Sequence, residues 1–139
     1  MTRTAAFDER ADHVWASARR DYPILVKRDL QTLHWRFDDG PYRHLYHRYY
    51  FTRRGEIVGY AVLRLEQVNG NVIGRVVDYL VVRRFLAPAL ALIIAEVART
   101  GAAAAVFAQW LDGCEILLRR LGCLRTRSSH RCGFKLVDP

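Results

Sequence analysis

Cysteine, proline and glycine are scarce in this sequence, and each scarcity excludes a class of protein. The 139 residues include three cysteines, four prolines and nine glycines. Cys114, Cys123 and Cys132 are odd in number and lack CxxC or Cys/His metal spacing, so we interpret them as thiols without a metal or a disulfide. Since glycine and proline are few and no segment is repeated or of low complexity, the sequence does not fit a disordered or solenoid protein.

Long hydrophobic runs are absent as well. The longest apolar run, from Phe85 to Ala95, ends at Glu96 and is shorter than the ~20 residues that a membrane-spanning helix needs. The first residues, MTRTAAFDERADHVW, contain acids before any apolar core, which is unlike a signal peptide. We therefore expect a cytoplasmic protein without a membrane partner.

The residues that are present favour one basic globular domain. A hydrophobic content of 51% is enough to build a core, and we expect residues 1 to 139 to form a single domain. The formal net charge of +8 predicts a surface that attracts anions. Cofactor phosphates, nucleic acid and acidic partners all satisfy this condition, so charge alone does not choose among them.

The first forty residues predict two helices. Apolar residues recur at spacings of three and four over residues 7 to 20, which is typical of an amphipathic helix, and Tyr22-Pro23 ends it. A second, shorter helix is expected over residues 28 to 37, with Asp29 as a plausible cap. The turn signature DDGP follows at residues 38 to 41.

From Tyr42 the pattern changes to strands. Three antiparallel strands are expected near residues 45 to 53, 56 to 67 and 71 to 82, and Asn69-Gly70 is a strong hairpin signal. A crossover helix near residues 88 to 100 then leads to an apolar strand parallel to its predecessor. A helix near residues 111 to 121 and two short strands near 123 to 127 and 132 to 137 follow. The predicted fold is α+β, with a mixed, mostly antiparallel sheet flanked by helices in the order α-α-β-β-β-α-β-α-β-β.

The stretch YLVVRRFLAPALALIIAEVA, residues 79 to 98, reads as a strand, a basic turn and a helix. Its turn, Arg84-Phe85-Leu86-Ala87-Pro88-Ala89, resembles the Q/R-x-x-G-x-G/A turn of the GCN5-related N-acetyltransferase superfamily. LLRRLGC, residues 117 to 123, resembles the later Y-x-K-L-G-F pattern of that family. RDLQTLHWRF, followed by a proline and a tyrosine, is similar to a bacterial acetyltransferase-like branch with an L-x-WRF motif.

This resemblance implies an acyltransferase that uses acetyl-CoA as cosubstrate and acetylates an amine of a small molecule or peptide. It implies that Arg84 and the backbone around Ala87 and Ala89 hold the pyrophosphate of the coenzyme. It also implies that the strand at Val81 and Val82 meets the pantetheine and supplies a backbone amide for the thioester oxygen.

Three features depart from the family pattern. Pro88 lacks an amide hydrogen, and alanines stand where the family has glycines. Leu118 occupies the position where many members have a tyrosine that protonates the leaving thiolate. The first strand of the family fold is not evident before Phe7.

Asp78 is the candidate catalytic base, because it is the only acid in VIGRVVDYLVV and some family members place a base on this strand. A carboxylate among apolar residues has a raised pKa unless it is paired. The alternative is a structural ion pair with Arg75, Arg64 or Arg28 that holds the sheet to a helix.

Two other functions remain open at this point. YRHLYHRYYFTRR, residues 42 to 54, alternates cations and aromatics as a platform for single-stranded nucleic acid does, although a half-exposed strand has the same alternation. Alternatively, the altered phosphate turn and Leu118 suit a catalytically inactive module that binds a partner or forms a homodimer. Of these functions, acyl transfer is the one that the sequence favours.

Overall fold

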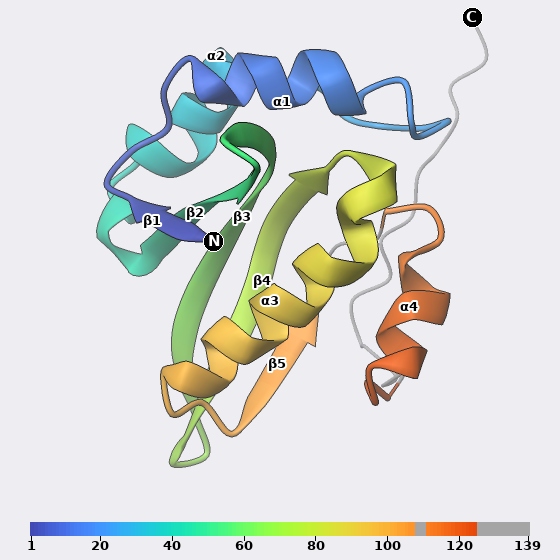
Figure 1. Cartoon of the computed structure of the whole chain (residues 1–139). Coiled ribbons are helices and arrows are strands. Elements are labelled where there is room, and N and C mark those ends of the chain that lie inside the picture. The colour runs from blue at the N-terminus through green and yellow to red at the C-terminus, as the bar shows by residue number, and fades with distance from the viewer. Residues whose placement is uncertain (108–110, 125–139) are drawn as a thin grey trace, which may run out of the picture.

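Five strands form one sheet in the sequential order β1-β2-β3-β4-β5 in the computed structural model, which describes residues 1–107 and 111–124 (Figure 1). The first four strands are antiparallel neighbours, and β5 runs parallel to β4. The strands are β1 (Thr2–Thr4), β2 (Tyr46–Arg53), β3 (Glu56–Val68), β4 (Asn71–Val81) and β5 (Ala104–Phe107). The α-helices are α1 (Arg10–Ala18), α2 (Leu30–Leu33), α3 (Leu86–Arg99) and α4 (Cys114–Arg120).

The three central strands confirm the sequence prediction to within one residue at most ends. Arg54-Gly55 and Asn69-Gly70 connect them, and both residues of each pair have positive φ angles, 50° and 85° in the first and 50° and 80° in the second. Positive φ at both central positions is the geometry of the tight turn that matches strand twist. The parallel strand after the crossover helix is confirmed too. The two expected C-terminal strands fall almost entirely outside the described residues, as does Cys132.

The expectation that no strand precedes Phe7 is wrong. β1 pairs with β2 through Thr2 opposite Tyr50 and Thr4 opposite Arg48. It has only three residues and no buried side chain, so it is too short to produce an alternating hydrophobic pattern. Its pairing partner lies more than forty positions away, which no local pattern reveals.

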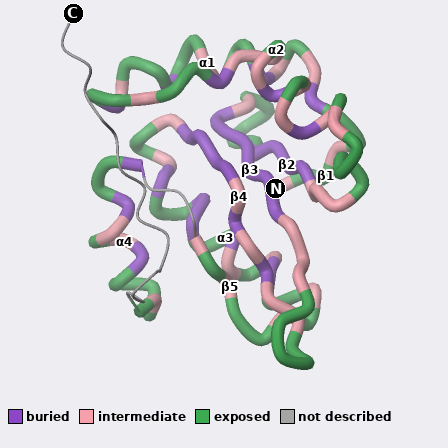
Figure 2. The backbone as a smooth tube through the Cα atoms, turned by 180° about the vertical axis from the view of Figure 1, so that it is seen from behind, coloured by how far each residue is buried: buried purple, intermediate pink, exposed green. Residues whose placement is uncertain are grey.

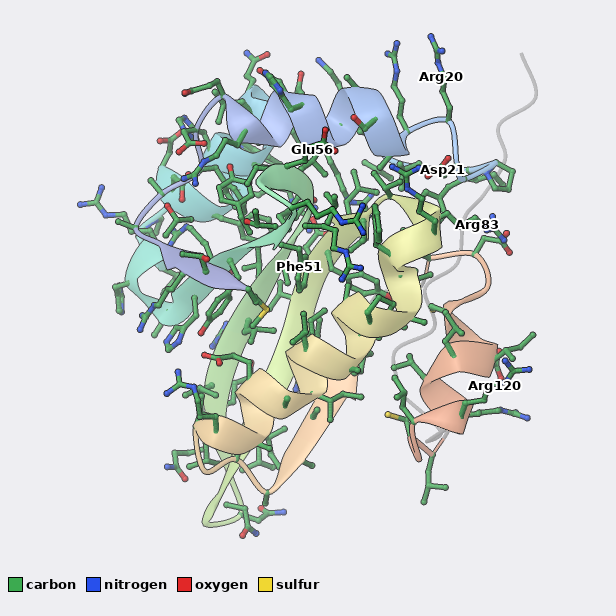
Figure 3. All side chains as sticks on the ribbon, viewed as in Figure 1. Arg20, Asp21, Phe51, Glu56, Arg83 and Arg120 are labelled. Atoms are coloured by element: carbon green, nitrogen blue, oxygen red, sulfur yellow. The ribbon has the colours of Figure 1, made fainter. Side chains whose placement is uncertain are left out.

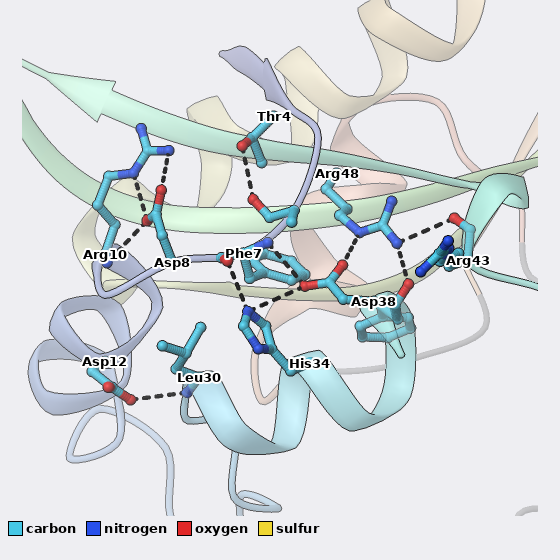
Figure 4. Close-up of polar contacts among 12 residues, drawn as sticks. Thr4, Phe7, Asp8, Arg10, Asp12, Leu30, His34, Asp38, Arg43 and Arg48 are labelled. Carbon is cyan, nitrogen blue, oxygen red and sulfur yellow. Dashed lines mark hydrogen bonds and ion pairs between the residues drawn. The ribbon is translucent and has the colours of Figure 1, made fainter. Parts of the chain in front are cut away.

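A polar network anchors the segment between β1 and α1 (Figure 4). The Phe7 amide donates to Asp38 Oδ2 at 2.9 Å, and His34 Nε2 donates to the Phe7 carbonyl at 2.8 Å. Arg48 of β2 forms a buried ion pair with Asp38 Oδ1. The network ties the N-terminal segment to β2 and to the π-helical turn His34–Asp38, which continues α2. At the start of α2, the Asp29 side chain accepts from the Thr32 amide, as the predicted cap does.

Helices cover both faces of the sheet. Tyr50 lies within hydrogen-bonding distance of Asp8, just before α1, whereas the hydroxyl of the neighbouring Tyr49 donates to Glu96 of α3 at 2.9 Å. Since successive side chains of a strand point to opposite faces, α1 and α2 lie on one face and α3 on the other. α4 packs beside α3. Figure 2 shows the buried residues gathered in the upper sheet between these layers. No helix in the described ranges is long and apolar enough to cross a membrane.

Candidate functional site

The parallel pair β4 and β5 is short, and β4 continues past it. β5 pairs with β4 from Ile73 opposite Ala104 to Val76 opposite Phe107. β4 extends for five more residues, to Val81. Among the described residues no strand pairs with this side of β4 beyond Val76. Within the part of the chain that the structure describes, β4 therefore has an open edge there, without a strand partner.

The backbone groups of Val81 lie on this side of β4, and Val81 itself is fully buried. The Val82 amide donates to the Val58 carbonyl of β3 at 2.9 Å, and successive backbone groups of a strand alternate in direction. The Val81 amide and carbonyl therefore point away from β3, and the Tyr22 hydroxyl donates to that carbonyl at 2.7 Å. Of the two valines expected to meet a thioester, Val81 has its amide at the opening, while the Val82 amide is already occupied.

The turn after β4 leads directly into α3. The residues Arg83–Phe85 form one 3-10 turn, whose first carbonyl accepts from the Leu86 amide. The carbonyl of the N-cap residue, Phe85, takes the first intrahelical bond, which comes from the Ala89 amide. Pro88 has no amide hydrogen. Ala87 is thus the first-turn residue whose amide remains for a ligand, and it is exposed.

The two arginines of this turn differ in their hydrogen bonds and ion pairs. Arg83 is held by Asp21, whose carboxylate accepts from its amide at 2.8 Å, and by Asp112, which accepts from its guanidinium at 2.9 Å. Figure 3 labels Arg83 and Asp21 at the start of α3. Arg84 lies 4.8 Å over the Phe85 ring and forms no ion pair with a described residue. Arg84 is therefore the available cation beside a hollow of about 470 Å³ lined by both arginines, Asp21 and Val82.

Asp78, the candidate base, is fully buried on the face covered by α1 and α2. One carboxylate oxygen accepts from Arg28 Nε at 3.0 Å and the other from Arg36 at 2.9 Å. The Tyr60 hydroxyl lies 3.3 Å from the second oxygen. The ion pair with Arg28, left open as an alternative by the sequence, is therefore present, and Arg36 is a partner that the sequence did not indicate. The catalytic role of Asp78 stays a prediction.

Tyrosines and apolar residues fill the surroundings of the open edge. Burial raises the pKa of Tyr22 above its ordinary value, with the Asp21 charge adding to the effect. Burial also raises the pKa of Tyr79 and of the neighbouring Cys114 thiol. Leu118 of α4 is buried in the core. The position at which the resemblance would place a tyrosine hydroxyl is therefore occupied by an apolar side chain that packs in the core. Sequence reasoning missed Tyr22 as a site residue, because it treated Tyr22-Pro23 only as a helix stop.

The rings of the proposed nucleic-acid platform differ in exposure: Tyr42 is 64% exposed, and Tyr46 is half-buried. Tyr49, Tyr50 and Phe51 are buried, with no more than 3% of their surface exposed. Bases therefore have no access to stack on them. The sequence offers five arginines that could extend the platform. Arg119 and Arg120 are exposed on α4, whereas Arg125, Arg127 and Arg131 lie outside the described residues.

Comparison with known proteins finds similarity at the level of three-dimensional structure. No family model and no curated protein matches the chain. The structure of a probable acetyltransferase superposes with a TM-score of 0.64 at 12% identity over 100% of both chains. The ribosomal-protein-alanine N-acetyltransferase from Brucella melitensis biovar Abortus gives 0.61 at 18% identity, covering 92% of this chain and 96% of its own. An aminoglycoside 6'-N-acetyltransferase from Acinetobacter haemolyticus gives 0.57 at 12%, covering 99% and 100%. At these identities the likeness shows a common fold.

Proposed function

Because this chain has the fold of the GCN5-related N-acetyltransferase superfamily, we propose that it is an acyl-CoA-dependent N-acyltransferase that moves the acetyl group of acetyl-CoA to an amine. The observation that carries the proposal is the open edge of β4 at Val81, directly before a basic turn and the start of α3. An extended pantetheine arm suits a strand edge without a strand partner, as an added strand does.

The turn supplies the groups for the coenzyme phosphates. Arg84 offers a guanidinium without a carboxylate partner among the described residues, and the exposed residue Ala87 contributes its amide to the first turn of α3. Ala89 is buried, and its amide belongs to the helix ladder. We therefore assign phosphate contacts to Arg84 and Ala87, and a packing role to Ala89.

We place the thioester of acetyl-CoA next to the backbone amide of Val81. The neutral acceptor amine attacks the thioester carbonyl and forms a carbon–nitrogen bond, and the carbon–sulfur bond breaks. Coenzyme A leaves as a thiolate, which takes up the proton that the nitrogen loses. Negative charge develops on the carbonyl oxygen, which the Val81 amide would stabilise. Asp78 faces the helical layer and is held by two guanidinium groups, so we infer that it positions this layer against β4.

A catalytically inactive module is the second candidate. It is favoured by one observation, the burial of Leu118 in the core at the place where the family carries its acid. Such a module would fold and bind a partner without a response to coenzyme A. Ligand binding therefore separates the two functions.

The test is thermal unfolding with acetyl-CoA and with free coenzyme A. A ligand that binds only the native state at a hundredfold excess over Kd stabilises it by ~2.7 kcal/mol, which raises the melting temperature by several degrees. Arg84→Ala should reduce this shift. Arg120→Ala, which removes an exposed arginine on α4, is the matched control and should keep it. If millimolar ligand does not shift the melting temperature of the unmodified protein, the proposal is overturned and the inactive module is the remaining function.

A further inference from the structure

Arginines without an ion pair gather at one end of the sheet. Among the described residues, nine arginines pair with a carboxylate and eight do not. Five of these eight lie at the end where β4 leads into α3, and all five are exposed: Arg19, Arg20, Arg53, Arg54 and Arg84. The unpaired positive charge of the described chain is therefore concentrated around the proposed phosphate turn.

The end of α1 brings two of these arginines to the turn. Arg19 and Arg20 follow the last residue of α1. Asp21, the next residue, accepts from the Arg83 amide at 2.8 Å, and its carbonyl accepts from the Arg83 guanidinium at 3.0 Å. Both arginines are therefore fixed within a few residues of the turn, on the face of the sheet that α1 covers.

The turn between β2 and β3 brings two more. The Val82 amide, at the end of β4, donates to the carbonyl of Val58, only four residues after Arg54. The tight turn at Arg53 and Arg54 therefore lies just beyond this end of β4, on the side of β3. Figure 3 labels Glu56, next to this turn, in the upper part of the molecule, as it does Arg20 and Arg83.

Negative charge is scarcer at this end. Asp21 and Asp112 both hold Arg83, and Glu56 is exposed without an ion pair to a described residue. Together with Arg83, the five unpaired arginines amount to six positive charges against three carboxylates. Like charges that are held close together repel and destabilise the compact state. The excess therefore favours an anionic partner at this end of the sheet.

One phosphate uses only part of this charge. The proposed phosphate contacts are Arg84 and the Ala87 amide, and Pro88 has no amide to add. The other unpaired arginines approach from two further directions, the α1 face and the β2–β3 turn. A nucleotide leaves its phosphate in one direction, whereas a protein surface covers all of these directions at once. The arrangement therefore fits a broad acidic surface around a single phosphate.

We propose that Arg19, Arg20, Arg53 and Arg54, here called the basic rim, bind the acidic surface of a carrier protein whose phosphopantetheine arm enters along the open edge of β4. Such an arm is joined to its protein through one phosphate, which would lie at Arg84. The inference rests on the proposed acyl transfer and adds the partner that presents the acyl group. The bonds that form and break stay the same, and the leaving thiolate is then that of the carrier-bound arm. Exposed complementary charges steer such docking and allow release after transfer.

Fluorescence anisotropy of a labelled carrier protein tests the proposal. The probe is the acidic acyl carrier protein of bacterial fatty acid synthesis, with the arm (holo) and without it (apo). At low salt the holo form should bind about tenfold or more tightly than the apo form and than free phosphopantetheine, because arm and surface bind together. Added salt should weaken this binding, since it screens exposed charges. A holo form that binds no more tightly than free phosphopantetheine would overturn the proposal.

Variants of the β2–β3 turn separate the carrier from coenzyme A. Arg53→Gln combined with Arg54→Gln should weaken binding of the holo carrier about tenfold at low salt, because two exposed charge pairs are lost. It should leave the Kd of coenzyme A unchanged. Replacing both arginines with lysine keeps the charges and should keep the affinity, and Glu56→Gln should raise it. Arg120→Gln removes an exposed, unpaired arginine on α4 and is the control, with both Kd values unchanged.

Failure of this inference is distinguishable from failure of the proposed function. If the glutamine variant weakens coenzyme A and the carrier alike, the basic rim holds phosphates of the coenzyme and the carrier proposal is wrong. If the apo form binds as tightly as the holo form, the arm does not enter the open edge and the proposal is wrong as well. In both cases acyl transfer from coenzyme A still stands. If neither coenzyme A nor phosphopantetheine raises the melting temperature, acyl transfer itself is wrong.

Discussion

The buried ion pairs of Asp78 with Arg28 and Arg36 give this residue a structural role. Its side chain is fully buried, and that of Arg28 is 6% exposed. Arg28 also donates to the Val26 carbonyl at 3.0 Å, so the pair holds the connection between α1 and α2 against β4. A buried carboxylate with two guanidinium partners is a strong structural constraint, because removing one member leaves buried charge uncompensated.

Asp78→Asn should destabilise the fold by about 3–5 kcal/mol, since Arg28 would lose its buried counter-charge. Urea unfolding measures this change. The control is Asp112→Asn, which breaks a pair whose side chains are about half exposed and should cost less than about 1 kcal/mol. A stable Asp78→Asn protein that binds acetyl-CoA normally but transfers no acetyl group would restore Asp78 as the base.

At the scale of elements, the approach of α3 to the sheet depends on a glycine in β4. A Cβ at Gly74 would lie closer to the Val97 methyl groups of α3 than van der Waals contact allows. The glycine therefore lets the helix pack directly on the strand. This contact fixes the distance between β4 and the C-terminal end of α3.

Gly74→Ala should destabilise the protein by about 1–3 kcal/mol through overpacking. Combining it with Val97→Ala should cost less than the sum of the two single changes, because the second removes the clash. Thermal unfolding of the three variants checks this coupling. Gly40→Ala is the control, since an added Cβ there meets no atom within 4 Å, and its effect should stay within about 0.5 kcal/mol. Strict additivity would show that α3 does not depend on Gly74.

At the scale of the whole molecule, tyrosines make up much of the core on both faces of the sheet. Burial is the largest cause that raises the pKa of Tyr22, Tyr49, Tyr50, Tyr60 and Tyr79. The pKa of Tyr49 and that of Tyr50 are each raised to about 12. The folded state therefore keeps protons that the unfolded chain releases near pH 10.

The free energy of unfolding should accordingly fall as pH rises from 10 toward 12. The unfolded state binds fewer protons in this range, so each such tyrosine removes about 1 kcal/mol per pH unit. Urea unfolding at several pH values measures the slope, and the absorbance of the buried tyrosines as tyrosinates should appear together with unfolding, after that of the exposed Tyr42. Tyr50→Phe should make the slope shallower. A stability that stays constant up to pH 11 would contradict the burial of these hydroxyls.

Much of the architecture follows from local patterns in the sequence. Three features depend on interactions between residues close in sequence: the alternation over residues 46 to 81, the turn at Asn69-Gly70 and the cap at Asp29. A local sequence pattern therefore predicts them. The strand, basic turn and helix around Arg84 are equally local, and they led to the fold prediction that the structure confirms. A cytoplasmic location and a homodimer stay predictions.

Only the tertiary structure decided what meets across long separations. It paired β1 with β2, brought Tyr22 to the Val81 carbonyl and chose Arg28 and Arg36 as partners of Asp78. It also placed the bulge at Val77, which turns Arg75 to the face of Asp78. The alternation of apolar and polar residues does not predict a bulge. A one-residue shift in register turns every following side chain of the strand to the opposite face of the sheet. The sequence determined which elements form and which residue types they carry, whereas long-range pairing determined which of those residues share a site.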